Sequence, residues 1–268
     1  MSRATAEIGI IGGTGFYRFL EDAEEVEVET PFGAPAAPIT IGAAGGRRVA
    51  FLPRHGLDHR FPPHRVPYRA NLWALKELGV TRVFGPCAAG SLRREIRPRT
   101  LVVCDQAVDF TKSRPTTFYD GPQTRHVSFA DPYCPTLREV LVKSAADLGI
   151  SHRDGGTMVV VEGPRFSTTA ESRMFSQLGC DVIGMTQFPE VTLARELELC
   201  YGTVALVTDY DVGVDDIEPV THEEVLKVFG ENIDTLRDLL SAAIPAVPVE
   251  RTCPCATALA GTGGTDHD

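Results

Sequence analysis

The sequence predicts a single α/β domain with a mixed, mostly parallel central sheet flanked by helices. The chain has 268 residues, which suits one large domain, and short apolar runs alternate with helical patterns that glycine commonly ends. Hydrophobic residues make up 43% of the chain, as in an average folded globular protein. We assign the domain to residues 1–246 and a partly flexible C-terminal tail to residues 247–268, where Gly, Thr and Ala dominate from Thr252 on.

The first half of the chain predicts buried strands around one helix. Residues 7–11 are an apolar run that ends in a glycine-rich turn, and residues 48–53 are a second apolar run. Leucines at helical spacing predict a helix over residues 71–78, which Gly79 closes. The remaining elements are, in order, a strand at 82–84, a loop of small residues at 85–91 and a strand at 100–103.

The second half alternates helices with strands. An amphipathic helix over residues 135–148 is closed by Gly149, and a helix over residues 170–178 ends at Gly179. Such alternation favours parallel strands, because parallel neighbours need a crossover connection. The remaining elements are, in order, strands at 156–161 and 181–185, a helix at 189–200, a strand at 203–207 and a long helix at 222–243.

The composition argues against several classes of protein. The formal net charge of −10 argues against a nucleic-acid partner, which requires a basic face. No apolar run approaches about 18 residues and the N-terminus lacks a signal-peptide pattern, so we expect a cytoplasmic protein without a membrane partner. The seven cysteines are expected mainly as small core residues, and their spacing does not give four zinc ligands, so no metal site is predicted.

Unusual side chains follow the ends of several predicted strands. The carboxyl ends of strands in an α/β sheet share one edge, where ligands bind. The sequence therefore predicts that five separate segments meet at one site. These segments carry Thr14, Arg54-His55, Cys87-Ala88, Met185-Thr186 and Asp209.

Two of these segments suit an anion. The turn Gly12-Gly13-Thr14-Gly15 lets backbone N–H groups approach a phosphate, and the Thr14 hydroxyl can donate to it. Arg54 offers a planar fork for two phosphate oxygens, and His55 can add a donor. The alternative interpretations of the first segment are a dinucleotide-binding turn and a plain tight turn. A surface arginine beside a structural histidine stays open for the second.

Two segments suit a purine base. Phe166 lies in a loop after a strand, where its ring can stack on a base, with a core position as the alternative. Asp209 and Asp211 follow a buried strand, two residues apart. A carboxyl group there can accept from a 6-amino group, and with a raised pKa it can protonate N7 of a departing purine. The alternative is a helix N-cap or a solvated turn.

Together these segments resemble the methylthioadenosine phosphorylase branch of the trimeric purine nucleoside phosphorylase family. The resemblance covers residues 8–246, nearly the whole chain. It is carried, in order, by Gly12-Gly13-Thr14-Gly15, Thr30-Pro31-Phe32-Gly33, Arg54-His55-Gly56, Asn71-Leu72-Trp73-Ala74-Leu75-Lys76-Glu77, Gly90-Ser91-Leu92, Phe118-Tyr119-Asp120-Gly121, Glu162-Gly163-Pro164-Arg165-Phe166-Ser167, Met185-Thr186, Pro189-Glu190 and Thr208-Asp209-Tyr210-Asp211.

The resemblance implies a homotrimer with one site for phosphate and one for a nucleoside. His126 would be lent by a neighbouring subunit to the 5′ end of the nucleoside, and Val225 would form part of the wall there. The ribose would lie over Met185, and the purine near Phe166. Inorganic phosphate would contact Thr14, Arg54, His55, Cys87, Ala88 and Thr186.

The implied reaction is phosphorolysis of S-methyl-5′-thioadenosine by a pentosyltransferase of purine and methionine salvage. Phosphate is a co-substrate, and no metal or organic cofactor is implied. Asp209 and Asp211 would face the N7 and 6-amino edge of the purine, and Thr186 would complete the catalytic set. The products are adenine and a 5-substituted ribose 1-phosphate.

Several residues depart from the family pattern or add to it. Cys87 stands where the family often has a threonine, and a thiol is a weaker donor. His222 stands where members that accept a 5′-hydroxyl tend to have histidine, so adenosine stays open as a substrate, with a helix cap as the alternative. Cys253-Pro254-Cys255 resembles the CxC tail of some heat-stable members, where it is a disulfide element, but a reduced exposed tail stays open. Cys134 and Cys200 can also pair if they lie close together.

Three other functions stay open from the residues alone. The first is a broader purine nucleoside phosphorylase that acts on adenosine, inosine or guanosine. Asp209 argues against 6-oxopurines, which the family usually meets with Asn at that position. The second is a non-catalytic nucleoside- or dinucleotide-binding protein, and the third is a hydrolytic nucleosidase, which would give the phosphate-binding residues no task.

Overall fold

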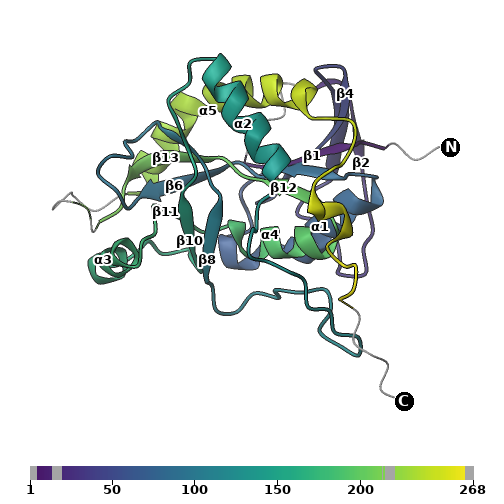
Figure 1. Ribbon diagram of the computed structural model, residues 1–268, viewed down its shortest axis with the longest axis horizontal. Coiled ribbons are helices and arrows are strands. Elements are labelled where there is room, and N and C mark those ends of the chain that lie inside the picture. Colours follow the sequence, from purple (N-terminus) through teal and green to yellow (C-terminus); the bar gives the residue numbers. More distant parts are fainter. Residues whose placement is uncertain (1–4, 14–19, 213, 215–220, 263–268) are drawn as a thin grey trace.

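The strands of the computed structural model, which describes residues 5–13, 20–212, 214 and 221–262, form two sheets (Figure 1). The first has the order β12 (Cys200–Gly202), β5 (Arg82–Phe84), β1 (Ile8–Gly12), β4 (Arg47–Pro53), β3 (Ile39–Ala44) and β2 (Glu21–Val26). The second has the order β8 (Gln106–Phe110), β10 (Thr157–Val161), β11 (Val182–Gly184), β6 (Cys87–Ser91), β13 (Ala205–Tyr210), β7 (Leu101–Val103) and β9 (His152–Asp154).

Both sheets are mixed. In the first, β12, β5, β1 and β4 are parallel, and β3 and β2 extend the sheet with antiparallel pairings. In the second, the pairs β8–β10, β10–β11, β6–β13 and β7–β9 are parallel, whereas β11–β6 and β13–β7 are antiparallel. The predicted α/β class is confirmed, with the difference that the strands are divided between two sheets.

The division falls within one pair of chain segments. β5 leads into β6 through Gly85-Pro86, beside the segment that leads from β12 into β13. Gly85 N–H donates to Gly202 O at 2.9 Å, and Cys87 N–H donates to Val204 O at 3.1 Å. Pro86 has no N–H to donate, so it interrupts the ladder where the paired segments pass from one sheet to the other.

Helices cover both sides of the sheets (Figure 1). On one side, α2 (Pro135–Asp147) packs on α5 (His222–Ala246), and Leu137, Leu141, Leu236 and Leu240 belong to one buried cluster. On the other side, α1 (Tyr68–Glu77) packs on α4 (Gln187–Glu196), while α3 (Thr169–Gln177) lies beyond the second sheet. Two 3-10 turns, η2 (Pro63–Arg65) and η3 (Pro254–Thr257), complete the described elements. Among the described helices, none combines the length and apolar character that a bilayer span requires.

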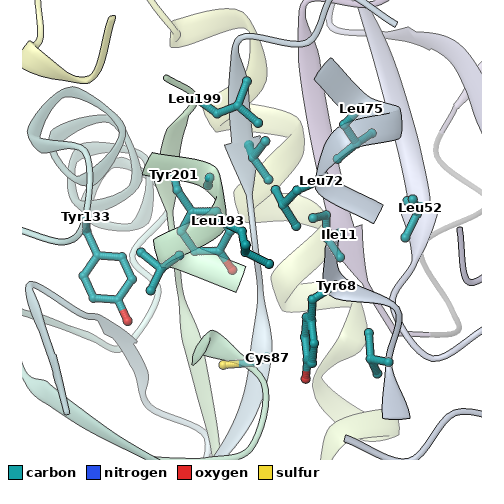
Figure 2. Close-up of a cluster of buried hydrophobic side chains, with 14 of the residues drawn as sticks. Ile11, Leu52, Tyr68, Leu72, Leu75, Cys87, Tyr133, Leu193, Leu199 and Tyr201 are labelled. Atoms are coloured by element: carbon teal, nitrogen blue, oxygen red, sulfur yellow. The ribbon is translucent and has the colours of Figure 1, made fainter. Parts of the chain in front are cut away.

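A large buried cluster fixes the strand that leads to the site. Figure 2 shows Leu72 and Leu75 of α1 facing Ile11 and Leu52 of the first sheet. All four side chains are fully buried. Because β4 carries Leu52 in this cluster, the residues directly after β4 start from a rigid position.

Some predicted boundaries differ from the structure. The helix predicted to Cys200 ends at Glu196, because Glu198 adopts a left-handed φ of 56° and Cys200 opens β12. Residues 87–91, predicted as part of a loop, form β6. The strands β2, β3, β8, β9 and β12 were not predicted. β2 has the sequence EDAEEV and an exposed or half-exposed pattern, so no hydrophobic periodicity marks it.

Candidate active site

A cavity of about 510 Å³ gathers the strand-end segments that the sequence singled out. The residues that follow Pro53 at the end of β4 line the cavity, as do residues of β6 and the carboxyl ends of β11 and β13. The lining includes nine of the predicted site residues, which are Arg54, His55, Cys87, Ala88, Phe166, Met185, Thr186, Asp209 and Asp211. The predicted meeting of separate segments is therefore observed for the described residues.

Arg54 is held almost completely inside the protein by Glu190. Only 2% of Arg54 and 0% of Glu190 are exposed. Arg54 Nε and Nη2 each donate to the Glu190 carboxylate at 2.8 Å. Burial alone would lower the pKa of Arg54, but the carboxylate of Glu190 holds that pKa above its ordinary value. The arginine is therefore a fixed cation at the wall of the cavity.

The fork of Arg54 is already occupied, which corrects its predicted geometry. Nη2 also donates to Ile11 O at 2.8 Å, and Nη1 donates to Pro86 O at 3.0 Å. A guanidinium has five N–H groups, so only one, on Nη1, is left for a ligand. Arg54 cannot hold two phosphate oxygens with its fork in this arrangement, although its charge and one N–H remain.

His55 lines the cavity as a neutral ring. Its Nδ1 lies 2.8 Å from Phe61 O, and its ring stacks on His59 with centroids 4.2 Å apart. Burial, with the charges of Arg54 and His59, lowers the pKa of His55 to about 3. A carbonyl can only accept, so Nδ1 carries the hydrogen and Nε2 is an acceptor. This corrects the predicted donor role of His55.

Thr186 and Cys87 offer two small polar groups at the same cavity. Thr186 precedes α4, is 7% exposed, and its side chain makes no capping hydrogen bond to that helix. Burial raises the pKa of the Cys87 thiol, so it stays protonated near neutral pH. A protonated thiol is a poor nucleophile, so the chemistry of the cavity falls to the other groups.

Asp209 and Asp211 flank the glycine of β6 at the cavity. A Cβ on Gly90 would lie 3.0 Å from Asp209 Oδ1 and 3.5 Å from the Asp211 Cβ. The Thr208 hydroxyl donates to Asp209 Oδ2 at 2.6 Å. Burial raises the pKa of Asp211, and its Oδ2 is buried with no hydrogen-bond partner among the described residues. The pair thus contains one acid that the protein pushes toward its protonated form.

Phe166 and Met185 supply an apolar surface. Phe166 is 36% exposed while it lines the cavity, so part of its ring is accessible to a planar ligand. Gly163, at a φ of 64°, lies against Met185, where a Cβ would come within 2.7 Å of Met185 Sδ. Arg114 connects the loop that carries Gly163 and Phe166 with the segment that carries Met185, because it donates to Glu162 O at 2.6 Å and to Met185 O at 2.7 Å.

These features can hold an anion beside a planar base and deliver a proton to that base. The sequence pattern of the Phosphorylase superfamily matches residues 7–245 of this chain. The chain belongs to this superfamily. The resemblance stated from the sequence motifs is thereby confirmed.

Relatives of this phosphorylase carry two related names. A purine nucleoside phosphorylase of Streptomyces coelicolor is 54% identical over 97% of this chain and 96% of its own. An S-methyl-5′-thioadenosine phosphorylase of Thermococcus kodakarensis is 56% identical over 94% of this chain and 97% of its own. The crystal structure of a methylthioadenosine phosphorylase from an antarctic soil metagenomic library superposes with a TM-score of 0.91, at 39% identity, over 98% of this chain and 94% of that one.

Four predicted site residues of the phosphorylase are not placed at the cavity. Thr14 lies outside the described residues, although neighbouring Gly13 lines the cavity. The side chains of His222 and Val225 also lie outside the described part. His126 is exposed and is not part of the cavity lining, in a segment that was expected to serve a neighbouring subunit.

Sequence reasoning missed the residues that hold the phosphorylase site in place. Glu190 was noticed only as part of the Pro189-Glu190 block, and no role followed for it. Tyr201 donates to Glu190 Oε1 at 2.5 Å and completes the support of Arg54. Arg114 lies in a loop without periodicity, so no sequence signal marks it. Glu190 alone had a signal, since a charged residue in an apolar helix needs a partner.

Proposed function

We propose that this phosphorylase cleaves S-methyl-5′-thioadenosine with inorganic phosphate and releases adenine and 5-methylthioribose 1-phosphate. The relative from Thermococcus kodakarensis, at 56% identity, carries the name of this activity. The observation that carries the proposal is one cavity that holds the acidic pair Asp209 and Asp211 together with Arg54, His55 and Thr186. An acid for the base and a cation for the phosphate are the two needs of the reaction.

In this proposal, phosphate binds in the cavity beside Arg54. The fixed charge of Arg54 attracts the anion and its remaining Nη1 hydrogen donates to one oxygen. The Thr186 hydroxyl donates to another. His55 Nε2, as an acceptor, takes a hydrogen bond from a P–OH group, which favours a phosphate that retains a proton. Thr14, Cys87 and Ala88 complete the proposed phosphate contacts.

The acidic pair Asp209 and Asp211 assists the departure of the base. The purine stacks near Phe166 and the ribose lies over Met185. The C1′–N9 bond breaks with its electron pair going to the purine, and a phosphate oxygen forms the new bond to C1′. Asp209 helps to protonate N7, and Asp211 lies at the same N7 and 6-amino edge, where burial raises its pKa and keeps a proton within the acidic pair. The proton neutralises a leaving group that would otherwise be an anion.

The proposed reaction requires only these groups and phosphate as a co-substrate. No metal or organic cofactor has a step in it. We propose a homotrimer in which the exposed His126 of one subunit reaches the 5′ end of the nucleoside on its neighbour. A cytoplasmic location stays a prediction.

A broader specificity is the second candidate, since the Streptomyces coelicolor relative carries the name purine nucleoside phosphorylase. His222 is the residue that favours it on sequence grounds, because an imidazole can donate to a 5′-hydroxyl. Replacement of His222 by Val is expected to lower activity on adenosine and spare activity on S-methyl-5′-thioadenosine. An unchanged ratio of the two activities would assign His222 to the helix end.

Base release from S-methyl-5′-thioadenosine, adenosine and inosine, each with and without phosphate, tests the proposal. We expect phosphate-dependent release of adenine, fastest from S-methyl-5′-thioadenosine. Equal kcat/KM for adenosine and inosine would support the broader enzyme. Release that needs no phosphate would show a nucleosidase, and no release from any of the three would show a binding protein.

A further inference from the structure

Four cysteines from distant parts of the chain meet in one buried cluster. Cys134 immediately precedes α2, Cys200 opens β12, and Cys253 and Cys255 lie on either side of Pro254 at η3. Their Sγ atoms all lie within 4.8 Å of one another. Cys253 is 9% exposed and Cys255 is 1% exposed, so the alternative of an exposed cysteine tail is wrong.

We infer that this cluster is a structural zinc site with four thiolate ligands. Zinc binds four sulfurs tetrahedrally at about 2.3 Å, which places the sulfurs about 3.8 Å apart. The Sγ atoms of Cys200 and Cys253 are 3.3 Å apart and the others lie within the 4.8 Å limit, so small side-chain movements suffice. A small cavity of about 10 Å³ lies beside three of the four cysteines, Cys134, Cys200 and Cys253.

The charges around the cluster favour such an ion. Four thiols release four protons when zinc binds, and the resulting centre has a net charge of −2, from +2 for zinc and −4 for the sulfurs. Arg251 lines the same small cavity together with Glu250 and with Arg82, which is paired with Glu7. Arg251 Nε is buried without a hydrogen-bond partner among the described residues. Donors of this kind commonly hydrogen-bond to zinc-bound sulfur.

A pair of disulfides fits these surroundings less well. Two neutral disulfides would leave the buried Arg251 Nε without a negative partner, and a bond between Cys253 and Cys255 would close a strained ring. Disulfide formation also needs an oxidant, whereas zinc binding only exchanges protons for a metal ion.

The site would tie the C-terminal segment to the body of the protein. It joins residues 253–255 to the start of α2 and to β12, which are separated from them by more than fifty residues. None of the four cysteines lines the 510 Å³ cavity, so the zinc would be structural and its test is independent of the proposed reaction. All four positions are filled by sulfur, as in closed structural sites.

The test measures metal and thiols on the full chain, purified without chelator. We expect about one zinc per chain by elemental analysis, retained in Cys180→Ser, whose buried cysteine lies outside the cluster, and lost in Cys255→Ser. Reconstitution of the reduced wild-type chain with Co²⁺ should give the absorption bands of a tetrahedral thiolate site, and removal of the metal should lower Tm. The zinc content and the Co²⁺ spectrum of the wild-type chain test the inference even if a variant does not fold.

Two results would overturn the inference. One is a wild-type chain that binds neither Zn²⁺ nor Co²⁺ after reduction. Fewer than seven thiols titrating in the unreduced, unfolded chain would then identify disulfides. The other is an equal zinc content in the wild type and in Cys255→Ser.

Discussion

The guanidinium of Arg54 is bound by the carboxylate of Glu190 through two hydrogen bonds of 2.8 Å. Both residues lie inside the protein, and Tyr201 donates to the same carboxylate. Such a pair does more to place a charge than to add stability, because burial of both ions costs much of what their attraction returns. The pair therefore fixes the position of a positive charge at the wall of the cavity.

Replacement of Glu190 by Gln is expected to lower the free energy of unfolding by about 3 kcal/mol, because it leaves the Arg54 charge buried without its counter-ion. Urea denaturation measures the change. The matched control is Asp147→Asn, which breaks the exposed pair with Lys143 at 3.0 Å and should cost less than about 1 kcal/mol. Similar losses of unfolding free energy in the two variants would show that the buried pair contributes no more to stability than the exposed pair.

Replacement of Thr186 by Val is expected to raise the KM for phosphate about tenfold and leave the KM for the nucleoside nearly unchanged, because one hydroxyl donor to the anion is lost. Initial rates at varied phosphate and nucleoside concentrations separate the two constants. Thr117→Val is the control, since that hydroxyl donates to Glu196 Oε1 at 2.7 Å and Thr117 does not line the cavity. An equal rise in both constants would remove Thr186 from the phosphate site.

His55 is expected to make the protein less stable in acid. Its folded pKa of about 3 lies below the ordinary 6.5, so the unfolded chain binds a proton that the folded chain does not. The contribution is therefore retained above pH 6.5 and lost as the pH falls toward 3, by about 2 kcal/mol between pH 7 and pH 5. Urea denaturation at both pH values should show a smaller loss in His55→Gln than in the wild type. The exposed His126→Gln should behave as the wild type.

Gly163→Ala is expected to raise the KM for the nucleoside, because the new Cβ would come within 2.7 Å of Met185 Sδ. Gly46→Ala is a matched control, since Gly46 also has a positive φ, of 74°, but has open space around its Cβ position. Both variants should lose about 1 kcal/mol of stability through backbone strain. Only Gly163→Ala should change the kinetics, and a similar KM in both variants would contradict the role of Gly163.

Asp209→Asn is expected to shift the preference from adenosine toward inosine by about 10² in the ratio of kcat/KM, because an amide can donate to O6 where a carboxylate repels it. Adenine and hypoxanthine release under identical phosphate concentrations gives the ratio. The exposed Asp131→Asn should leave it unchanged. An unaltered ratio in Asp209→Asn would remove this carboxylate from the base site.

The sequence by itself determined the α/β class, most strands and helices, and the segments that reach the cavity. Apolar runs such as the one that forms β1 and glycines such as Gly149 and Gly179 are local signals, so a single sequence contains them. A shared edge of parallel strands does not explain why these segments meet, because β4 belongs to the first sheet, whereas β6, β11 and β13 belong to the second, where β11 runs antiparallel to β6. β2 carried no such signal, because only its pairing with β3 makes it a strand.

The tertiary structure decided which side chains act on one another. Glu190 lies 136 positions from Arg54, and Cys253 lies 53 positions from Cys200, so no local pattern could connect them. The donor and acceptor roles of Arg54 and His55 also depend on partners that folding supplies, Ile11 and Pro86 for one and Phe61 for the other. A residue type sets what a side chain can do, and its folded neighbours decide which of those capacities remain for a ligand.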